Sequence, residues 1–365
     1  MLDAMYARYA RGEVALRDEI ELLAEQSTAE VVQRQVDLGI DIVGNGEHCR
    51  ETFFTHVRDR FSGFGGVGDP RPFRDILEFP TYLELKLPRY MREDSVSLAQ
   101  VPAATAAVIY EGTAAIDAEI AQLARHAKAS GAHQCFVTAP SPGIIAAAMT
   151  NRYYPSINEY IDAITEGLAR EYRAIVDAGF VLQIDAPDLA MERHTMFANE
   201  SLETFQVFAQ SVVAAINYAT AGLDRDRIRL HVCWGNYDGP HCFDVPLADM
   251  IDTYVSANVG SLVLSLANPR HAHEYRLLSA IPSHKTIVVG CIDTTSNYVE
   301  HPEVVADRLM RVAEVVNDPG RLLAGTDCGF ATAAGMSDIA SEIAWLKLAS
   351  LVEGAALASD RLGLS

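Results

Sequence analysis

Residues 228–233 read Ile-Arg-Leu-His-Val-Cys, a short apolar run that ends on two side chains able to bind a metal ion. Its branched side chains predict a buried β-strand, because such residues pack well on a pleated surface. Runs of the same kind recur along the chain, and polar residues such as Asp185, Asp293 and Cys328 follow several of them. These further runs cover residues 40–43, 133–137, 180–184, 262–266, 286–290 and 321–325.

Amphipathic stretches separate the apolar runs. Residues 156–178, 201–220 and 302–316 show helical periodicity, and Ser156 followed by Glu159 has capping-box spacing. Strands that alternate with helices predict a parallel sheet. No run is followed by the Gly-x-Gly-x-x-Gly of a dinucleotide-binding sheet, whereas polar residues gather at strand ends, as at the mouth of a barrel. We therefore predict an α/β fold, a single (β/α)8 TIM barrel over residues 1–365.

The barrel is one strand short in this assignment. We expect the eighth strand either at 95–101 or ahead of the first run, in which case this chain lacks it. Residues 61–92 are rich in Pro, Gly and aromatic side chains and indicate an inserted arm or lid.

Composition limits the class of protein. The chain has 365 residues, 49% of them hydrophobic, and a formal net charge of −20, which argues against binding to nucleic acid or an anionic membrane. It has neither a long uninterrupted apolar segment nor the features of a secretory signal. We expect a cytoplasmic protein whose six cysteines are not disulfide-bonded, with small-molecule partners. The oligomeric state is open, with a homo-oligomer as one candidate.

His231 and Cys233 occupy positions i and i+2 of a strand, so their side chains point to the same side. Cys328 ends another strand and would join them across a barrel mouth. Two thiolates and one imidazole suit zinc and leave a fourth position for a substrate thiol. A His-x-Cys pair can equally be part of a packed core, and the pattern alone does not separate the two interpretations.

Six blocks of sequence, in order along the chain, resemble the C-terminal catalytic barrel of cobalamin-independent methionine synthase and its shorter relatives. The resemblance covers about residues 30–332 and implies a zinc enzyme with its ligands on His231, Cys233 and Cys328. It also places Glu47 and Asp185 on the carboxylates that hold the ammonium of a homocysteine-like substrate. The blocks are GNGEHCRETFF (44–54), VLQIDAPDLAM (181–191), RLHVCWGNYDGPHCFDVPL (229–247), ANPRHAHEY (267–275), GCIDTTSNYVEHPEVVADRL (290–309) and LLAGTDCGFAT (322–332).

The function that this resemblance implies is S-alkylation: zinc activates a small thiol as a thiolate, which attacks a methyl donor. Two departures stand out. Ser265 occupies the position of a family Glu that completes the zinc site, and Thr295 replaces a His that protonates the departing folate. Folate is therefore not specified as the donor.

One alternative within the same chemistry is an epoxyalkane:coenzyme M transferase, a related branch in which a zinc-bound thiolate opens an epoxide. Arg193 and Arg270 could then meet the sulfonate of coenzyme M. Two alternatives come from other classes: a metal-free barrel like uroporphyrinogen decarboxylase, and a thiol-binding protein without catalytic activity.

The remaining candidates are assigned by position. Asp293 is a candidate general acid or a support for the ligands, and Trp234 and Asn236 are candidate substrate-binding residues. We expect Asp327 to make structural hydrogen bonds. His241 is expected to pack a Gly-Pro loop, and His194 and His271 are expected at the surface or in loops.

Overall fold

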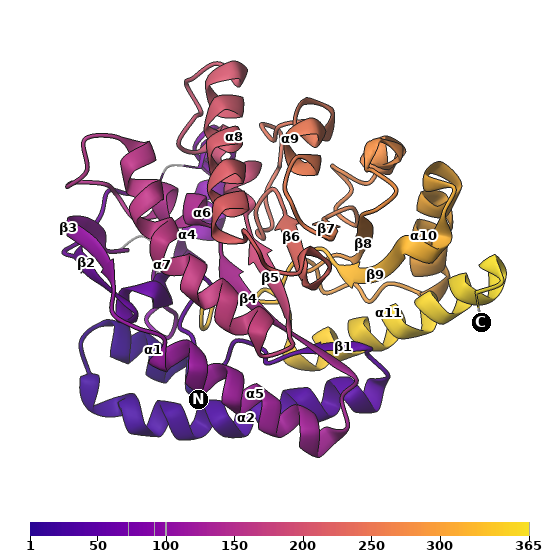
Figure 1. The fold of residues 1–365 in the computed structure, drawn as a ribbon, viewed down its shortest axis with the longest axis horizontal. Helices are drawn as coiled ribbons and strands as arrows, with labels where there is room; N and C mark the ends of the chain where they lie inside the picture. The colour runs from indigo at the N-terminus through magenta and orange to yellow at the C-terminus, as the bar shows by residue number, and fades with distance from the viewer. Residues whose placement is uncertain (72, 91, 99–100, 365) are drawn as a thin grey trace.

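The computed structural model describes residues 1–71, 73–90, 92–98 and 101–364. In these residues, seven strands form one curled parallel sheet in the order β1-β4-β5-β6-β7-β8-β9, and β2 pairs with β3 in a small antiparallel sheet (Figure 1). The strands span Ile42–Gly44 (β1), Phe61–Gly65 (β2), Ala103–Tyr110 (β3), Gln134–Pro140 (β4), Val181–Asp185 (β5), Ile228–Val232 (β6), Ser261–Leu264 (β7), Thr286–Ile292 (β8) and Leu322–Thr326 (β9).

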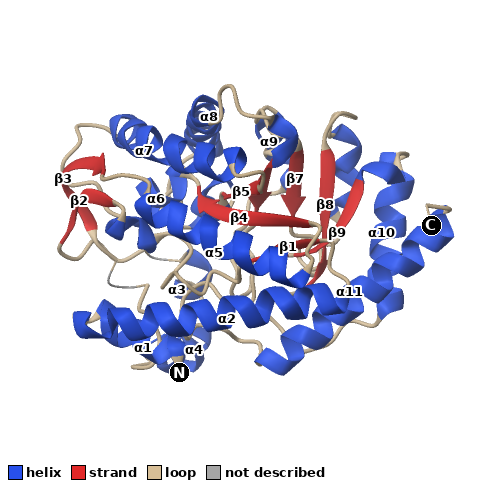
Figure 2. Cartoon of the chain, turned by 60° about the horizontal axis from the view of Figure 1, so that its bottom comes forward, coloured by secondary structure: helices blue, strands red, loops and turns tan. Residues whose placement is uncertain are grey.

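Helices surround the parallel sheet. In Figure 2, α7, α8 and α9 lie above the strands, and α2 and α11 lie below them. The helices span Leu2–Ala10 (α1), Arg17–Leu38 (α2), Arg74–Leu77 (α3), Pro80–Tyr90 (α4), Ala114–Ser130 (α5), Pro142–Ala148 (α6), Ile157–Asp177 (α7), Leu202–Ala219 (α8), Ile251–Val255 (α9), Pro302–Val316 (α10) and Ser341–Leu362 (α11). Among the described residues, none of these helices combines the length and apolar character that crossing a membrane requires.

The barrel-type α/β fold predicted from the sequence is confirmed. Each of the seven predicted runs forms a strand of the parallel sheet, within a few residues of its expected ends. The three predicted helices correspond to α7, α8 and α10. Ser156 caps α7 as its spacing suggested, because its hydroxyl accepts the backbone N–H of Glu159 at 3.2 Å.

The sheet does not close by strand pairing. Its edges are β1 and β9, which do not pair with each other in the described residues. Loops bridge the opening instead: Thr52 and Ala333 form an isolated antiparallel bridge, and Ala334 N–H donates to the Glu51 carbonyl at 2.8 Å.

The segment 95–101, one expected site of an eighth strand, lies partly outside the described residues. Its described residues form no strand. Val96 N–H donates to the Ala334 carbonyl at 2.9 Å, so the described part of this segment lies at the opening between β1 and β9.

The inserted arm contains β2, α3 and α4, and it continues past residue 92 because β3 pairs with β2. The pair packs on α7, where a Cβ on Gly167 would come within 2.2 Å of the Phe61 ring. The β2–β3 pair of the arm therefore lies on the outside of the barrel at one side (Figure 1).

A buried network of charges ties the arm and the loop after β1 to the barrel helices. Glu119 of α5 accepts from Arg50 at 2.7 Å and from Arg60 at 2.9 Å, and Arg60 also donates to Glu171 of α7 at 2.8 Å. Burial alone would raise the pKa of Glu119, but Arg50 and Arg60 lower it to about 2. The Glu119 carboxylate therefore stays ionised between the guanidinium groups of Arg50 and Arg60.

Replacing Glu119 with Gln should lower the free energy of unfolding by about 3–5 kcal/mol, because the buried Arg50 loses its paired carboxylate and the buried Arg60 keeps only Glu171. Urea denaturation followed by circular dichroism measures the change. The matched control is Glu303→Gln, which breaks an exposed pair with Arg361 and should cost about 1 kcal/mol or less. Equal losses in both variants would show that the buried network does not hold this part of the fold.

Candidate metal and substrate site

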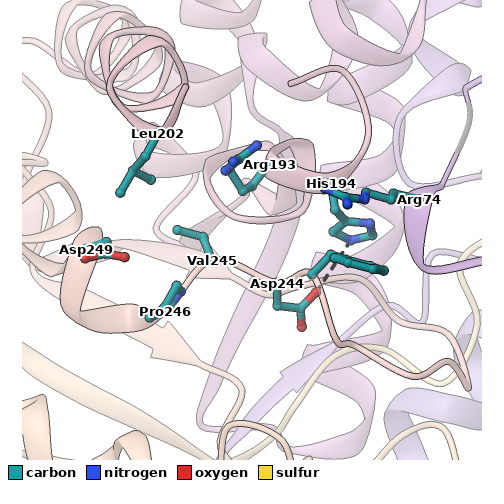
Figure 3. Close-up of a pocket in the computed structure, with 9 residues that line it drawn as sticks. Arg74, Arg193, His194, Leu202, Asp244, Val245, Pro246 and Asp249 are labelled. Atoms are coloured by element: carbon teal, nitrogen blue, oxygen red, sulfur yellow. Dashed lines mark ion pairs between the residues drawn. The ribbon is translucent and has the colours of Figure 1, made fainter. Parts of the chain in front are cut away.

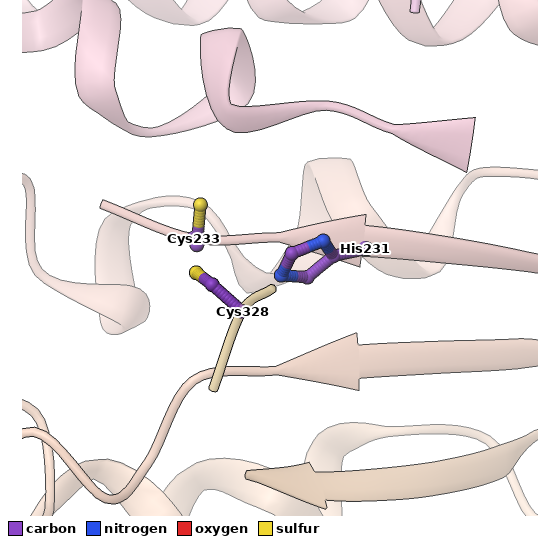
Figure 4. Close-up of side chains that lie close together, drawn as sticks. All are labelled: His231, Cys233 and Cys328. Carbon is purple, nitrogen blue, oxygen red and sulfur yellow. The ribbon is translucent and has the colours of Figure 1, made fainter. Parts of the chain in front are cut away.

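The register of the parallel strands places the predicted site residues at one end of the sheet. Asp185 ends β5 and pairs with His231 of β6, while Cys233 follows β6 and Cys328 follows β9. The side chains of His231 and the two cysteines lie close together (Figure 4), and their ligand atoms all lie within 4.8 Å of one another. The structure thus brings together the three residues expected to share an ion.

His231 has an oxygen partner on each ring nitrogen. Nδ1 lies 2.9 Å from Asp185 Oδ1, and Nε2 lies 3.0 Å from the Asp327 carbonyl oxygen. Burial lowers the pKa of His231, but hydrogen bonds with Asp185 and Cys233 raise it well above the ordinary value overall. A carboxylate on one ring nitrogen is the arrangement that orients a metal-binding histidine.

The sulfur atoms of the two cysteines lie within 4.8 Å of each other. The Cys328 thiol holds the pKa of Cys233 well below its ordinary value; burial opposes this effect and His231 adds to it. Ser265 Oγ lies 3.8 Å from Cys328 Sγ, so this serine stands directly beside one of the two sulfur atoms. Two sulfurs and an imidazole nitrogen gathered in a buried site fit zinc.

Asp327 has the structural role expected for it. Its Oδ1 accepts the backbone N–H groups of Leu266 and Ala267 at 2.9 Å each, and Oδ2 accepts that of Asn268 at 2.8 Å. These bonds attach the loop after β7 to the strand that precedes Cys328. Burial raises the pKa of Asp327 to about 6 even though the three N–H groups lower it.

Glu47 and Asp185 interact electrostatically across the strand ends. Glu47 has a left-handed backbone (φ 56°), and its carboxylate accepts from the Thr138 hydroxyl at 2.8 Å. Burial raises the pKa of Glu47, Arg50 opposes this effect, and the negative charge of Asp185 adds to it. Asp185 also orients His231, a role that the sequence did not predict for it. Two carboxylates in this relation favour a cation between them.

A small cavity of about 20 Å³ adjoins the sulfur cluster, with room for one water molecule or ion. Cys233, Cys328, Trp234, Asn236 and Asp293 all line it. Two hydrogen bonds fix the Asn236 side chain: its amide N–H donates to the Gly329 carbonyl at 2.7 Å, and its amide oxygen accepts from the Thr294 hydroxyl at 2.9 Å.

Asp293 is surrounded by donors. Its carboxylate accepts from the Thr295 backbone N–H and hydroxyl and from the Ser296 hydroxyl, at 2.6–2.8 Å. Burial raises the pKa of Asp293, but these hydrogen bonds lower it below the ordinary value overall. An ionised carboxylate suits a residue that supports the site better than it suits a general acid. The role of Asp293 as a general acid stays a prediction.

Arg193 is not among the residues that line the sulfur cavity. It lines a separate cavity of about 280 Å³, together with Arg74, His194 and Asp244 (Figure 3). The Arg193 guanidinium donates to the Phe197 carbonyl at 2.6 Å. Arg193 therefore does not share a cavity with Trp234 and Asn236, two of the other predicted substrate-binding residues.

A second polar cluster escaped the sequence analysis. His194 and His271 are 0% and 3% exposed, so neither is a surface residue, and both lie close to Asp244. His241 also contacts Asp244, so its side chain does more than pack the Gly-Pro loop as expected. In the sequence, the segment HCFD (241–244) places His241 and Asp244 three residues apart. No local pattern indicated that His194 and His271 would join them.

Residues 95–351, more than half of the chain, match the family model described as "Cobalamin-independent synthase, Catalytic domain". The chain belongs to this family. The match includes the segments that carry Asp185, His231, Cys233 and Cys328. The strands that position these four residues therefore all lie within the region that matches the family model.

Relatives within the family extend the comparison. A methionine synthase of Thermococcus kodakarensis is 29% identical over 214 residues, which is 58% of this chain and 54% of that protein. The chain thus spans about half the length of this relative. A methionine synthase of Sulfolobus acidocaldarius is 23% identical over 348 residues, covering 95% of this chain and 85% of that protein.

A solved structure shows the same fold. The B12-independent methionine synthase from Shewanella sp. W3-18-1, in complex with selenomethionine, superposes with a TM-score of 0.73. It covers 95% of this chain and 91% of its own, at 19% sequence identity.

Replacing Asp185 with Asn should weaken metal binding at His231, Cys233 and Cys328 by about 10–100-fold, the usual cost of losing a carboxylate that orients a ligating histidine. Titration with Co²⁺ measures this, because the thiolate-to-metal absorption band reports only a sulfur-ligated ion. Glu47→Gln is the control and should leave the Co²⁺ affinity unchanged. An unaltered affinity in Asp185→Asn would contradict the orienting role.

Proposed function

We propose that the protein is a zinc-dependent S-alkyltransferase that methylates a small, homocysteine-like thiol. His231, Cys233 and Cys328 would hold the ion, and Ser265 stands where the family has a fourth ligand. Bound zinc would lower the pKa of a substrate thiol and hold the sulfur as the nucleophilic thiolate. The sulfur–carbon bond forms as the bond from the methyl group to its donor breaks, and the leaving group keeps the electron pair.

One observation carries this proposal: the Asp185 carboxylate both contacts the ligand His231 and lies in the field of Glu47. A thiol that also bears an ammonium could reach the metal with its sulfur and these carboxylates with its nitrogen. Fixing both ends would restrict the sulfur to one line of attack. The small cavity at the sulfur cluster means that the loop carrying Trp234 and Asn236 has to open for such a substrate.

Ser265 favours a second candidate, epoxide opening by coenzyme M. A neutral serine at the position of the family Glu would leave the zinc ion with one anionic ligand fewer. The charges near the sulfur cluster favour the first candidate. Asp293 and Asp327 line its cavity, whereas Arg193 lines a different one. A sulfonate would meet negative charge there, and an ammonium would be attracted.

The test offers the zinc-loaded protein two pairs of substrates: homocysteine with a panel of methyl donors that includes a methylated folate, and coenzyme M with epoxypropane. We expect loss of free thiol and formation of methionine with the first pair only. Cys328→Ser should lower the rate by about 100-fold or more, since a bound metal supplies several kcal/mol. The exposed Cys242→Ser is the matched control. Turnover with the pair of coenzyme M and epoxypropane, and none with the homocysteine pair, would favour the second candidate and reject the first.

Glu47→Gln should raise the KM for homocysteine by about 10–100-fold with little change in kcat, because a charge-assisted hydrogen bond contributes about 1.5–3 kcal/mol. In the parent enzyme, KM should rise as the pH falls through the raised pKa of Glu47, since only the carboxylate binds the ammonium. The variant should lack this rise. Asp59→Asn removes an exposed carboxylate and should behave like the parent. The same pH profile in Glu47→Gln would show that Glu47 does not bind the amine.

A further inference from the structure

The second polar cluster, next to the sulfur site, has no part in the proposed function. It consists of His194, His241 and His271 around the carboxylate of Asp244. The four side chains are almost completely buried: 0% of His194, 4% each of His241 and His271, and 1% of Asp244 are exposed. The His271 ring stacks on Trp234, the residue after Cys233, with ring centroids 3.7 Å apart.

The histidines converge on one carboxylate. His241 Nδ1 lies 2.8 Å and His271 Nε2 lies 2.7 Å from Asp244 Oδ2. The ligand atoms of these three residues lie within 4.8 Å of one another. His194 approaches the other oxygen, with its Nε2 3.5 Å from Asp244 Oδ1. Three histidines from three segments of the chain therefore face one carboxylate, with His241 and His271 closest to it.

The outer nitrogens of two histidines are held by acceptors. His271 Nδ1 lies 2.7 Å from Glu274 Oε2, and His241 Nε2 lies 3.2 Å from the Tyr237 carbonyl oxygen. The other Glu274 oxygen accepts the Leu247 backbone N–H at 2.7 Å. Carboxylates and backbone carbonyls at these positions orient imidazoles toward a metal ion. His241 adopts a left-handed backbone (φ 53°) to reach this point.

Hydrogen bonds within the cluster leave polar atoms unsatisfied. In the described residues, both ring nitrogens of His194 and Oδ1 of Asp244 are buried without a hydrogen-bond partner. Such groups are rare because a buried polar atom without a partner loses the hydrogen bonds that it makes with water in the unfolded chain. Protonation of His241 and His271 would satisfy their own contacts but leave His194 and this oxygen without partners. A cation placed among the four side chains would supply the missing partner.

The cluster also has an open side. His194 and Asp244 line the cavity of about 280 Å³ together with Arg74 and Arg193 (Figure 3). Arg74 begins α3 of the inserted arm. The next residue, Asp75, accepts the Tyr237 hydroxyl and the Cys242 backbone N–H, at 3.0 and 2.9 Å. The arm thus covers the loop that carries His241, and the arginines would favour an anion as an additional ligand.

We propose that His194, His241, Asp244 and His271 bind a second divalent metal ion, separate from the sulfur site and facing the arginine-lined cavity. Imidazole and carboxylate ligands without sulfur suit Zn²⁺, Fe²⁺ or Mn²⁺. This assignment does not depend on the thiol chemistry, because it involves none of the three sulfur-site ligands.

The test uses the full chain with Cys233→Ser and Cys328→Ser, which disables the sulfur site. After chelation and reloading with Zn²⁺ alone, we expect this protein to retain one tightly bound equivalent. X-ray absorption should show only nitrogen and oxygen ligands at about 2.0–2.1 Å, without the sulfur shell at about 2.3 Å. Adding Asp244→Asn and His271→Gln should abolish the bound equivalent.

The matched control in the same background is His126→Gln. His126 also pairs with a carboxylate, Glu25 at 2.8 Å, but lies outside the cluster on α5. It should leave the bound equivalent unchanged. Absence of tight zinc in the cysteine double variant overturns the proposal whether or not the cluster variant folds. Zinc that survives Asp244→Asn with His271→Gln, or that shows sulfur ligation, overturns it as well.

Discussion

The hydrogen bond between Asp185 and His231 is the contact on which the rest of the site depends. It exists because β5 and β6 pair in parallel with these two residues in register, so both side chains reach the same end of the sheet. A shift of one residue would turn His231 to the opposite face. The same bond orients the imidazole toward Cys233 and Cys328 and fixes the carboxylate that an amino-acid substrate would meet.

The segment from Trp234 to Leu247 connects two centres of different chemistry. On one side lie the sulfur ligands, which suit the activation of a thiol. On the other lie imidazoles and a carboxylate, and His271 of this second cluster stacks on Trp234 and lines the same small cavity as Cys233 and Cys328. The segment can turn this tightly because Gly235 has φ 107° and because Gly239 leaves room for the Tyr237 ring, which a Cβ would approach to 2.1 Å. The arm stabilises the turn through Asp75.

Local patterns predicted the strands, because apolar runs of branched residues are typical of parallel strands, most of which are buried on both faces. They also predicted the helix with the Ser156 cap and the neighbourhood of His231 and Cys233, which follows from the two-residue period of a strand. Three features were not predictable in this way. Arg193 lines a separate cavity, loops bridge the sheet between β1 and β9, and His194 is buried. Each depends on how distant segments pack, and no local periodicity encodes that.

By itself, the sequence determined the order of strands and helices, the residues at the strand ends and the family to which the chain belongs. These properties follow from side-chain period and from residue types at fixed spacing. Only the tertiary structure decided which strand ends lie next to each other, which carboxylate meets which histidine, and that three histidines surround Asp244. The physical reason is that register, burial and the partner of each polar atom arise when the sheet curls, and one residue cannot specify them before its neighbours are in place.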